Sequence, residues 1–299
     1  MLKNLKFKID ILKVVIVVLM MAITISVRAE KLKRISSLSP NITEIIHQLK
    51  GEKYLVGRSN SCNYPASVTK IPVVGDLASI YIEKLLTTKT DLVFSIPMPN
   101  LQHKKILNSL KIKLVELKFN SIKNYFDNVK KIGNLLNLKH QAQNEVDRIT
   151  KLLVAQQLKV AAIPVKKRPR VLFVIWSKPL IIAAKTSYLN EFIELSGGVN
   201  VANTINKDYA KVSKEWILAQ KIDLVIVTKD AETLFNTFFS DSETKIIDAL
   251  KYNKIYCLKA EDKILRLSPR MFCGISELSN LISANFFKAV KTNKMVKNK

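Results

Sequence analysis

The chain has 299 residues, 48% of them hydrophobic, and a formal net charge of +25 at pH 7. This length exceeds one ordinary domain and suits two lobes, each large enough to bury its own core. So strong a positive charge would normally raise nucleic acid as a partner. The lysines, however, are scattered as singles and pairs with no basic run interleaved with aromatic residues, which predicts a solvated surface and no nucleic-acid site.

The first 29 residues have the three parts of a secretory signal. Lysines precede an apolar run at residues 14–25, and Val27-Arg28-Ala29 provides a cleavage site before Glu30. The run is shorter than the roughly 20 apolar residues that a membrane-spanning helix needs. We therefore expect an exported, soluble protein that begins near Glu30 and carries a net charge of +21. No cysteine follows the run, so lipid attachment is not expected, and an uncleaved N-terminal anchor is the alternative.

Residues 30–120 alternate between short apolar strands and amphipathic helices, which predicts an N-terminal lobe with a mainly parallel, doubly wound sheet. The first helix follows Ser39-Pro40-Asn41, where Ser39 or Asn41 is placed to cap it. The free amides at that helix start also suit an anionic or carbonyl-bearing ligand group. The expected order is a strand at 34–38, a helix at 42–49, a strand at 54–57, a helix from Glu83, a strand at 91–96, a helix at 101–110 and a strand at 113–117.

Residues 121–168 read differently, because their apolar positions have helical spacing and no strand interrupts them. They predict a long helical connector, whose second part would be a helix of about 24 residues and roughly 36 Å. A C-terminal lobe at 169–299 follows, ending in a basic tail after Lys288 that we expect to be frayed. Its expected elements are a strand at 170–176, a helix at 188–195, a strand at 254–258, a loop at 262–270 and a final helix from Met271.

An internal repeat links the two lobes. Residues 83–94 recur 132 positions later at 215–226, with Glu, Leu, Lys, Asp, Leu and Val in the same register. Each copy is a short helix that begins with an acidic residue and leads into an Asp-Leu-Val strand. Two similar lobes create a cleft at their junction, and small ligands usually bind in such clefts.

The residues do not favour an enzyme or a resident metal. Three cysteines, Cys62, Cys257 and Cys273, permit at most one disulfide in an oxidising compartment, and the sequence does not choose the pair. No Cys-x-x-Cys, His-rich cluster or Gly-rich phosphate loop is present. Cys62 with His103 as its base lacks an orienting third residue, so we expect a non-enzymatic protein without a cofactor of its own.

An ordered set of motifs spans residues 33 to 285. They are Ile35-Ser-Ser-Leu-Ser-Pro-Asn-Ile-Thr-Glu44, Val56-Gly57 with Asn63-Tyr-Pro65, Glu83 through Asp91-Leu-Val, Arg170-Val-Leu-Phe, Leu195-Ser-Gly-Gly-Val-Asn200, Val212-Ser-Lys-Glu215 and Arg266-Leu-Ser-Pro-Arg270. In this set the chain resembles the substrate-binding proteins of ABC importers for cobalamin and iron chelates, and within them the periplasmic cobalamin-binding subgroup most closely. The resemblance implies an α/β fold with two Rossmann-like lobes of mainly parallel sheets, joined by a long backbone helix, with the ligand cleft between them.

The resemblance also implies a partner. In this family an acidic residue on each lobe docks into arginine-lined pockets of the two subunits of an inner-membrane ABC permease, and Glu83 and Glu215 match those positions. Equivalent carboxylates on two lobes suit a two-fold symmetric permease. The alternative is that both residues merely favour helix N-termini. We expect the receptor itself to be a monomer.

Candidate ligand contacts are the residues at strand ends and loops that face the predicted cleft: Ser39, Asn41, Tyr64, Trp176, Tyr209, Asp262 and Arg266. The aromatic residues offer flat apolar area with a polar edge, suited to a corrin, a porphyrin or a catechol-bearing chelate. Arg266 could pair with a ligand anion or with Asp262, four residues earlier.

The transported ligand is expected to be cobalamin or another metal chelate. Leu77 and Ile96 stand where cobalamin binders of this family can carry tryptophan, which keeps haem, a ferric siderophore and a corrinoid precursor open. An exported, non-transport binding protein that recruits an acidic partner through its basic surface is the other alternative. It predicts salt-dependent binding and no ligand in the cleft.

Overall fold

A computed structural model describes residues 33–76, 79–98, 100–232, 254–259 and 261–284. The predicted signal, Leu77 and the basic tail lie outside these residues. The chain divides into two units, residues 1–33 and 34–299, and the fold described below belongs to the second. No helix in the described ranges is long and apolar enough to cross a membrane.

The first sheet consists of parallel strands in the order β3-β2-β1-β4-β5. Its two central strands are fully buried, as expected for parallel strands covered on both faces. The strands are β1 (Ile35–Ser37), β2 (Leu55–Ser59), β3 (Val73–Gly75), β4 (Leu92–Ser95) and β5 (Lys113–Glu116). The predicted parallel sheet of the first lobe is thus confirmed.

Helices α2 (Pro40–Gln48), α3 (Ile82–Thr87) and α4 (Leu101–Ser109) connect these strands. Proline in the first turn of α2 is favourable because that turn has no use for its missing N–H. Ile42, Ile45 and Ile46 bury one face of the helix against the sheet, which fixes the helix start beside the end of β1.

The second sheet is mixed. Strands β11 (Ile255–Cys257), β10 (Leu224–Val227), β6 (Arg170–Ser177), β7 (Leu180–Ala183) and β9 (Tyr209–Lys211) follow one another across it, and β8 (Val199–Asn200) pairs with β6. The pairs β10–β11, β10–β6 and β6–β8 are parallel, whereas β6–β7 and β7–β9 are antiparallel. The sequence reading missed the antiparallel strands β7 and β9, because β7 continues directly from β6 through a tight turn.

The second lobe contains helices α7 (Tyr188–Leu195), α8 (Lys214–Leu218), α11 (Glu261–Ile264) and α12 (Met271–Ile282). The expected loop at 262–270 is wrong at its start, because Asp262 lies in the short helix α11. A four-residue helix is too short to show helical periodicity in the sequence.

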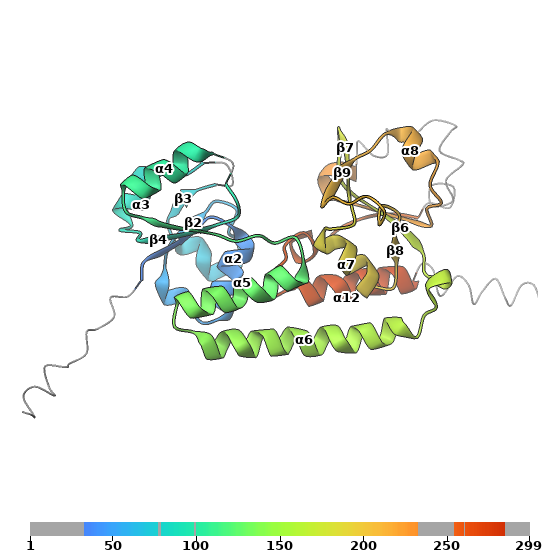
Figure 1. The fold of residues 1–299 in the computed structure, drawn as a ribbon, viewed down its shortest axis with the longest axis horizontal. Coiled ribbons are helices and arrows are strands. Elements are labelled where there is room, and N and C mark those ends of the chain that lie inside the picture. The colour runs from blue at the N-terminus through green and yellow to red at the C-terminus, as the bar shows by residue number, and fades with distance from the viewer. Residues whose placement is uncertain (1–32, 77–78, 99, 233–253, 260, 285–299) are drawn as a thin grey trace, which may run out of the picture. The chain divides into compact units, whose positions relative to one another are not determined.

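The predicted connector is formed by α5 (Ile122–Leu135) and α6 (Lys139–Ala161), the latter 23 residues long. Helix α6 packs against α5, α7 and α12 (Figure 1). Gln156 on α6 donates hydrogen bonds to the carbonyl of Leu195 at the end of α7 and to Ser279 of α12. One apolar core includes buried residues from both sheets and from α5 and α6. The two-lobed α/β fold with a backbone helix is therefore confirmed, while the numbered lobe boundaries remain predictions.

Candidate functional site

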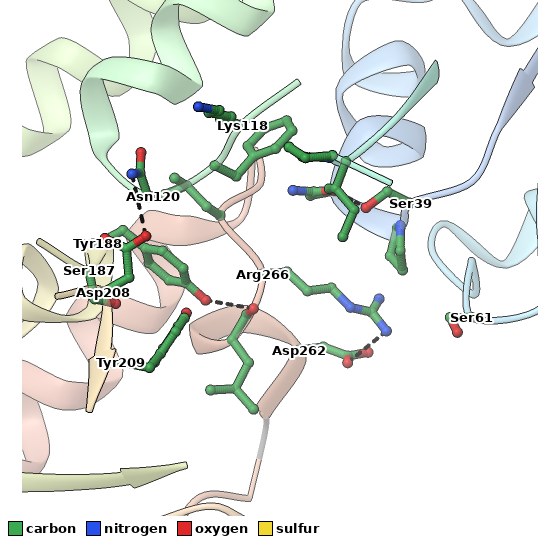
Figure 2. A pocket seen from close by; sticks show the side chains of 17 residues that line it. Ser39, Ser61, Lys118, Asn120, Ser187, Tyr188, Asp208, Tyr209, Asp262 and Arg266 are labelled. Atoms are coloured by element: carbon green, nitrogen blue, oxygen red, sulfur yellow. Dashed lines mark hydrogen bonds and ion pairs between the residues drawn. The ribbon is translucent and has the colours of Figure 1, made fainter. Parts of the chain in front are cut away.

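A cleft of about 660 Å³ is lined by residues of both lobes (Figure 2). Its volume is within the range of small-ligand sites. The first lobe supplies Ser39, Pro40, Asn41, Ser61, Ile96, Pro97, Lys118, Phe119 and Asn120, and the second lobe supplies Ser187, Tyr188, Asp208, Tyr209, Asp262, Leu265, Arg266 and Leu267.

The first lobe builds its wall from the segments that follow β1, β4 and β5. These strands are parallel, so their carboxyl ends meet at one edge of the sheet. Ser39 donates to Asn41 Oδ1, which also accepts from the Ile42 amide at 3.0 Å. Ser39 is the N-cap residue of α2, but its side chain makes no capping hydrogen bond, and Asn41 inside the first turn satisfies the Ile42 amide instead.

Residues 118–120 form the outer part of this wall. The side chain of Asn128 in α5 donates to the carbonyl of Lys118 at 2.6 Å and fixes the backbone there. Phe119 supplies a partly buried ring, whereas the Lys118 side chain is exposed. Among the described residues, no ion pair involves Lys118. The sequence reading missed these residues, although their place directly after a strand end was a usable signal.

The second lobe contributes two tyrosines of different exposure. Tyr188 is 6% exposed and its hydroxyl donates to the carbonyl of Leu265 at 2.7 Å. Tyr209, at the start of the antiparallel strand β9, is 43% exposed. Burial raises the pKa of both phenols, that of Tyr188 well above its ordinary value, so both stay neutral near pH 7.

Asp208 lies beside these tyrosines and has its own donors. It accepts hydrogen bonds from Thr186 at 2.5 Å and from Asn120 at 3.5 Å, the latter across the cleft. This carboxylate is therefore partly satisfied by protein groups before any ligand arrives.

Arg266 is also engaged with the protein. Its guanidinium pairs with Asp262 at 2.8 Å and with Glu44 at 3.4 Å, and donates to Asn63 Oδ1 at 2.7 Å. Of the two partners that the sequence suggested for Arg266, the structure shows Asp262.

The cleft brings together Ser39, Asn41, Tyr209, Asp262 and Arg266 of the predicted ligand contacts. It does not include Tyr64 or Trp176. The Tyr64 ring is 46% exposed and lies 3.9 Å from the Arg270 guanidinium, and Trp176 is 44% exposed with its indole donating to the Lys178 carbonyl. Ligand contact by any of the seven residues remains a prediction.

The charges of the cleft are balanced. Its lining holds Lys118 and Arg266 against Asp208 and Asp262, and the described lining residues include no histidine, cysteine or methionine. Across the described residues, no cluster of His, Cys, Asp and Glu could hold a metal ion. All three cysteines are free thiols, Cys62 being buried and Cys273 exposed. The site thus offers flat apolar surface, hydroxyls, amides and a balanced set of charges.

Residues 35–261 match the family described as periplasmic binding protein. The chain belongs to this family. Membership confirms the expectation of a binding protein rather than an enzyme.

Relatives of this periplasmic binding protein are named for several different ligands. The vitamin B12-binding protein of Vibrio vulnificus (strain CMCP6) is 24% identical over 87% of this chain and 93% of its own. A possible iron-binding, periplasmic solute-binding protein from Staphylococcus epidermidis ATCC 12228 is 28% identical, with a TM-score of 0.73 over 85% of this chain and 99% of its own. The structure of S. aureus IsdE complexed with heme is similar in fold, with a TM-score of 0.73 at 20% identity over 84% of this chain and 98% of its own.

Away from the cleft, this periplasmic binding protein presents Glu83 and Glu215 at equivalent places. Both carboxylates are exposed in the first turns of α3 and α8. A hydrogen bond from Ser213 is the main reason that the pKa of Glu215 is lowered. Both side chains are accessible at the surface, while their docking role remains a prediction.

Proposed function

We propose that this chain is the substrate-binding protein of an ABC importer and that its cleft takes cobalamin or a closely related corrinoid. The observation that carries the proposal is the balanced charge of a large cleft walled by aromatic, amide and hydroxyl groups. Such a surface suits a large ligand that is nearly neutral and rich in hydrogen-bonding groups.

The chemistry of a corrinoid matches this wall. A corrin ring offers a flat apolar face for Phe119 and Tyr209, and its peripheral amides can exchange hydrogen bonds with Asn41, Asn120 and Ser61. The nucleotide loop of cobalamin carries a phosphodiester, for which the ammonium of Lys118, which forms no ion pair with a described residue, is a suitable counter-ion.

Haem is the second candidate, because the fold is shared with a heme-bound receptor and Tyr209 exposes a phenol in the cleft. Tyrosine can ligate ferric haem iron. Against haem, its two propionates would find Lys118 as the cation of the described lining that is not already paired within the protein. A catecholate siderophore carries still more negative charge and fits the balanced lining less well.

Delivery to the permease would use Glu83 and Glu215, which lie at matching positions of the repeat. Charge-assisted contacts of this kind steer docking and set its register more than they add affinity. We propose that the receptor works as a monomer in the periplasm, exported by residues 1–29 and not lipidated. Because α6 ties both lobes into one core, ligand binding should change the lobe spacing only slightly.

Isothermal titration of residues 30–299 with cyanocobalamin, haem and a ferric siderophore in one buffer tests the ligand. We expect one-to-one binding of cyanocobalamin with a dissociation constant on the order of micromolar or lower. Haem binding without cyanocobalamin binding would move the assignment to the second candidate. Silence from all three ligands, with salt-dependent binding to an acidic protein, would favour the non-transport alternative.

A further inference from the structure

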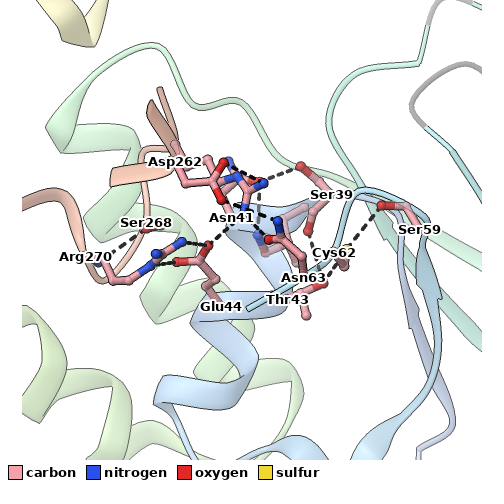
Figure 3. A network of polar contacts seen from close by, with 12 residues as sticks. Ser39, Asn41, Thr43, Glu44, Ser59, Cys62, Asn63, Asp262, Ser268 and Arg270 are labelled. Carbon is pink, nitrogen blue, oxygen red and sulfur yellow. Dashed lines mark hydrogen bonds and ion pairs between the residues drawn. The ribbon is translucent and has the colours of Figure 1, made fainter. Parts of the chain in front are cut away.

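The strongest feature outside the ligand-facing wall is a buried carboxylate that joins the lobes. Glu44 on α2 is 3% exposed, and both of its oxygens face arginines of the second lobe (Figure 3). Arg270 donates to them through Nε at 2.8 Å and Nη2 at 2.6 Å, and Arg266 approaches at 3.4 Å. A bidentate arginine–carboxylate pair of this kind fixes orientation as well as distance.

Two further residues of the first lobe hold the same arginines. Asn63 accepts from Arg266 at 2.7 Å and donates to Asp262 at 3.4 Å. The Tyr64 ring lies 3.9 Å from the Arg270 guanidinium, within the range of a cation–π contact. Every one of these contacts crosses from the segment at 44–64 to the segment at 262–270.

The segment at 265–270, which carries both arginines, also accepts hydrogen bonds from the second lobe and from α6. Tyr188 donates to the Leu265 carbonyl at 2.7 Å, and Arg148 of α6 donates to the Pro269 carbonyl at 3.0 Å. Arg148 is itself held by Glu145, a buried carboxylate that also accepts from Tyr125 and Gln48. The loop therefore moves with α6 and α7, and Glu44 is the buried charge that connects it to α2.

We propose that Glu44 is a positioning residue that sets the spacing between the two walls of the ligand cleft. It does so by holding residues 265–270, whose first three side chains line the cleft, against the helix that carries Ser39 and Asn41. Arg266 contributes to this clamp through its contacts with Glu44 and Asn63. The expected loss of ligand affinity rests on the proposed function, whereas the expected change in the distance between the lobes does not.

Removing Glu44 should have a larger effect than removing an exposed charge. The Arg266 and Arg270 side chains are only 16% and 18% exposed, and without Glu44 their charges would repel each other with poor access to water. Removing one partner of a buried ion pair leaves an uncompensated charge, which the chain can relieve by opening the lobes.

Pulsed electron–electron double resonance measures this opening as a distribution of distances between two spin labels. Spin labels would be placed at Lys105→Cys on α4 and Lys211→Cys on β9, both exposed positions, in the full chain with Cys257→Ser and Cys273→Ser. We expect Glu44→Gln to broaden the distance distribution about twofold and to weaken cyanocobalamin binding about tenfold, because the competent spacing becomes one of several. Adding Arg270→Gln to Glu44→Gln should narrow the distribution again, since the repulsion between the guanidiniums is gone.

Glu116→Gln is the matched control. The Glu116 carboxylate accepts from the Met98 amide and pairs with Lys104 at 2.9 Å, all within the first lobe, so its loss should leave the distance distribution unchanged. Identical distributions for Glu44→Gln and wild type, or equal broadening by Glu116→Gln, would overturn the proposal.

Tyr64→Ala provides a variant that does not disturb the buried charge. It removes the ring beneath Arg270 and should broaden the distance distribution less than Glu44→Gln does. If Glu44→Gln does not fold, this broadening by Tyr64→Ala tests the clamp in its place. A wild-type chain that fails to bind cyanocobalamin would count against the proposed ligand, while the distances would still test the clamp.

Discussion

The two lobes share a module and differ around it. Helix α3 leads into β4 in the first lobe as α8 leads into β10 in the second, and both strands are completely buried. Glu83 and Glu215 are both exposed, so the repeat places a carboxylate on the surface and a buried strand in the core of each lobe.

The lobes diverge where they meet the cleft. The first sheet is parallel throughout, and its wall consists of segments that follow strand ends, whereas the second adds the antiparallel strands β7 and β9 and presents Tyr209 from β9. The shared module thus serves the core and the outer face, and the elements added to it shape the ligand site.

Charge reversal at both repeated glutamates should have the largest effect. Glu83→Arg with Glu215→Arg would repel a cationic permease pocket on each side, and we expect uptake in a cellular transport assay to fall to background while ligand affinity is unchanged. The matched control reverses Glu52 and Asp147, which are exposed elsewhere. Loss of ligand binding in the double reversal would place the pair in the pocket instead.

A core substitution in either copy of the repeated strand tests whether the lobes fold together. Phe94 and Ile226 occupy equivalent buried positions, and truncation to alanine should reduce the free energy of unfolding by about 3–5 and 2–5 kcal/mol respectively. Both tryptophans, Trp176 and Trp216, lie in the second lobe.

Because one core is shared, Phe94→Ala should shift the urea transition seen by tryptophan fluorescence together with the transition seen by circular dichroism. A fluorescence transition that stays in place would show that the second lobe unfolds independently.

Lys118→Gln tests whether Lys118, rather than the ion-paired Arg266 of the second lobe, binds the anionic group of the ligand. We expect a loss of about 1 kcal/mol in the free energy of cyanocobalamin binding, because a partly exposed ion pair contributes little more than this. The salt dependence of binding should also weaken. Lys113→Gln, an exposed lysine on the preceding strand β5, is the control and should leave titration curves unchanged.

The smallest effect concerns the capping of the repeated helices. Ser213 accepts from the Trp216 amide at the start of α8, whereas the residue before α3, Tyr81, makes no side-chain cap. Ser213→Ala should lower the free energy of unfolding by about 1 kcal/mol in denaturant titrations. Tyr81→Ala should not remove any such cap.

The same substitution has a predictable pH dependence. The hydrogen bond from Ser213 lowers the pKa of Glu215 below its ordinary value of 4.5. A depressed carboxyl pKa stabilises the fold above the unfolded-state pKa, and that contribution is lost as the pH falls through the folded-state value. The difference between wild type and Ser213→Ala should therefore shrink in acid below about pH 4.5, and a difference that grows there would contradict this cause.

The hydrophobic periodicity of the sequence and its helix-breaking and turn residues were enough to predict most of the fold. The apolar runs of β4 and β10 and the uninterrupted helical pattern of α6 are local signals, and the structure has these elements at the expected places. The strands β7 and β9 were missed because these short antiparallel strands depend on pairing with β6 and with β7, respectively, rather than on their own pattern.

The site was predictable only in part for a related reason. Ser39 and Asn41 can be identified from the sequence because they stand at a helix start. The contact between Glu44 and Arg270, in contrast, joins residues 226 positions apart. No local pattern distinguishes a carboxylate that holds an inter-lobe arginine from one exposed on a helix, so that contact needed the structure.

The most direct test of a ligand held between the two lobes is a calorimetric titration of cyanocobalamin into wild type, Phe119→Ala and Tyr209→Ala. Each ring belongs to a different wall of the cleft, and loss of an aromatic stacking surface should weaken binding by about tenfold in either variant. The account predicts tight one-to-one binding by wild type and comparable losses in both variants. Unchanged affinity in both, or no heat of binding in wild type, would contradict a corrinoid bound between these walls.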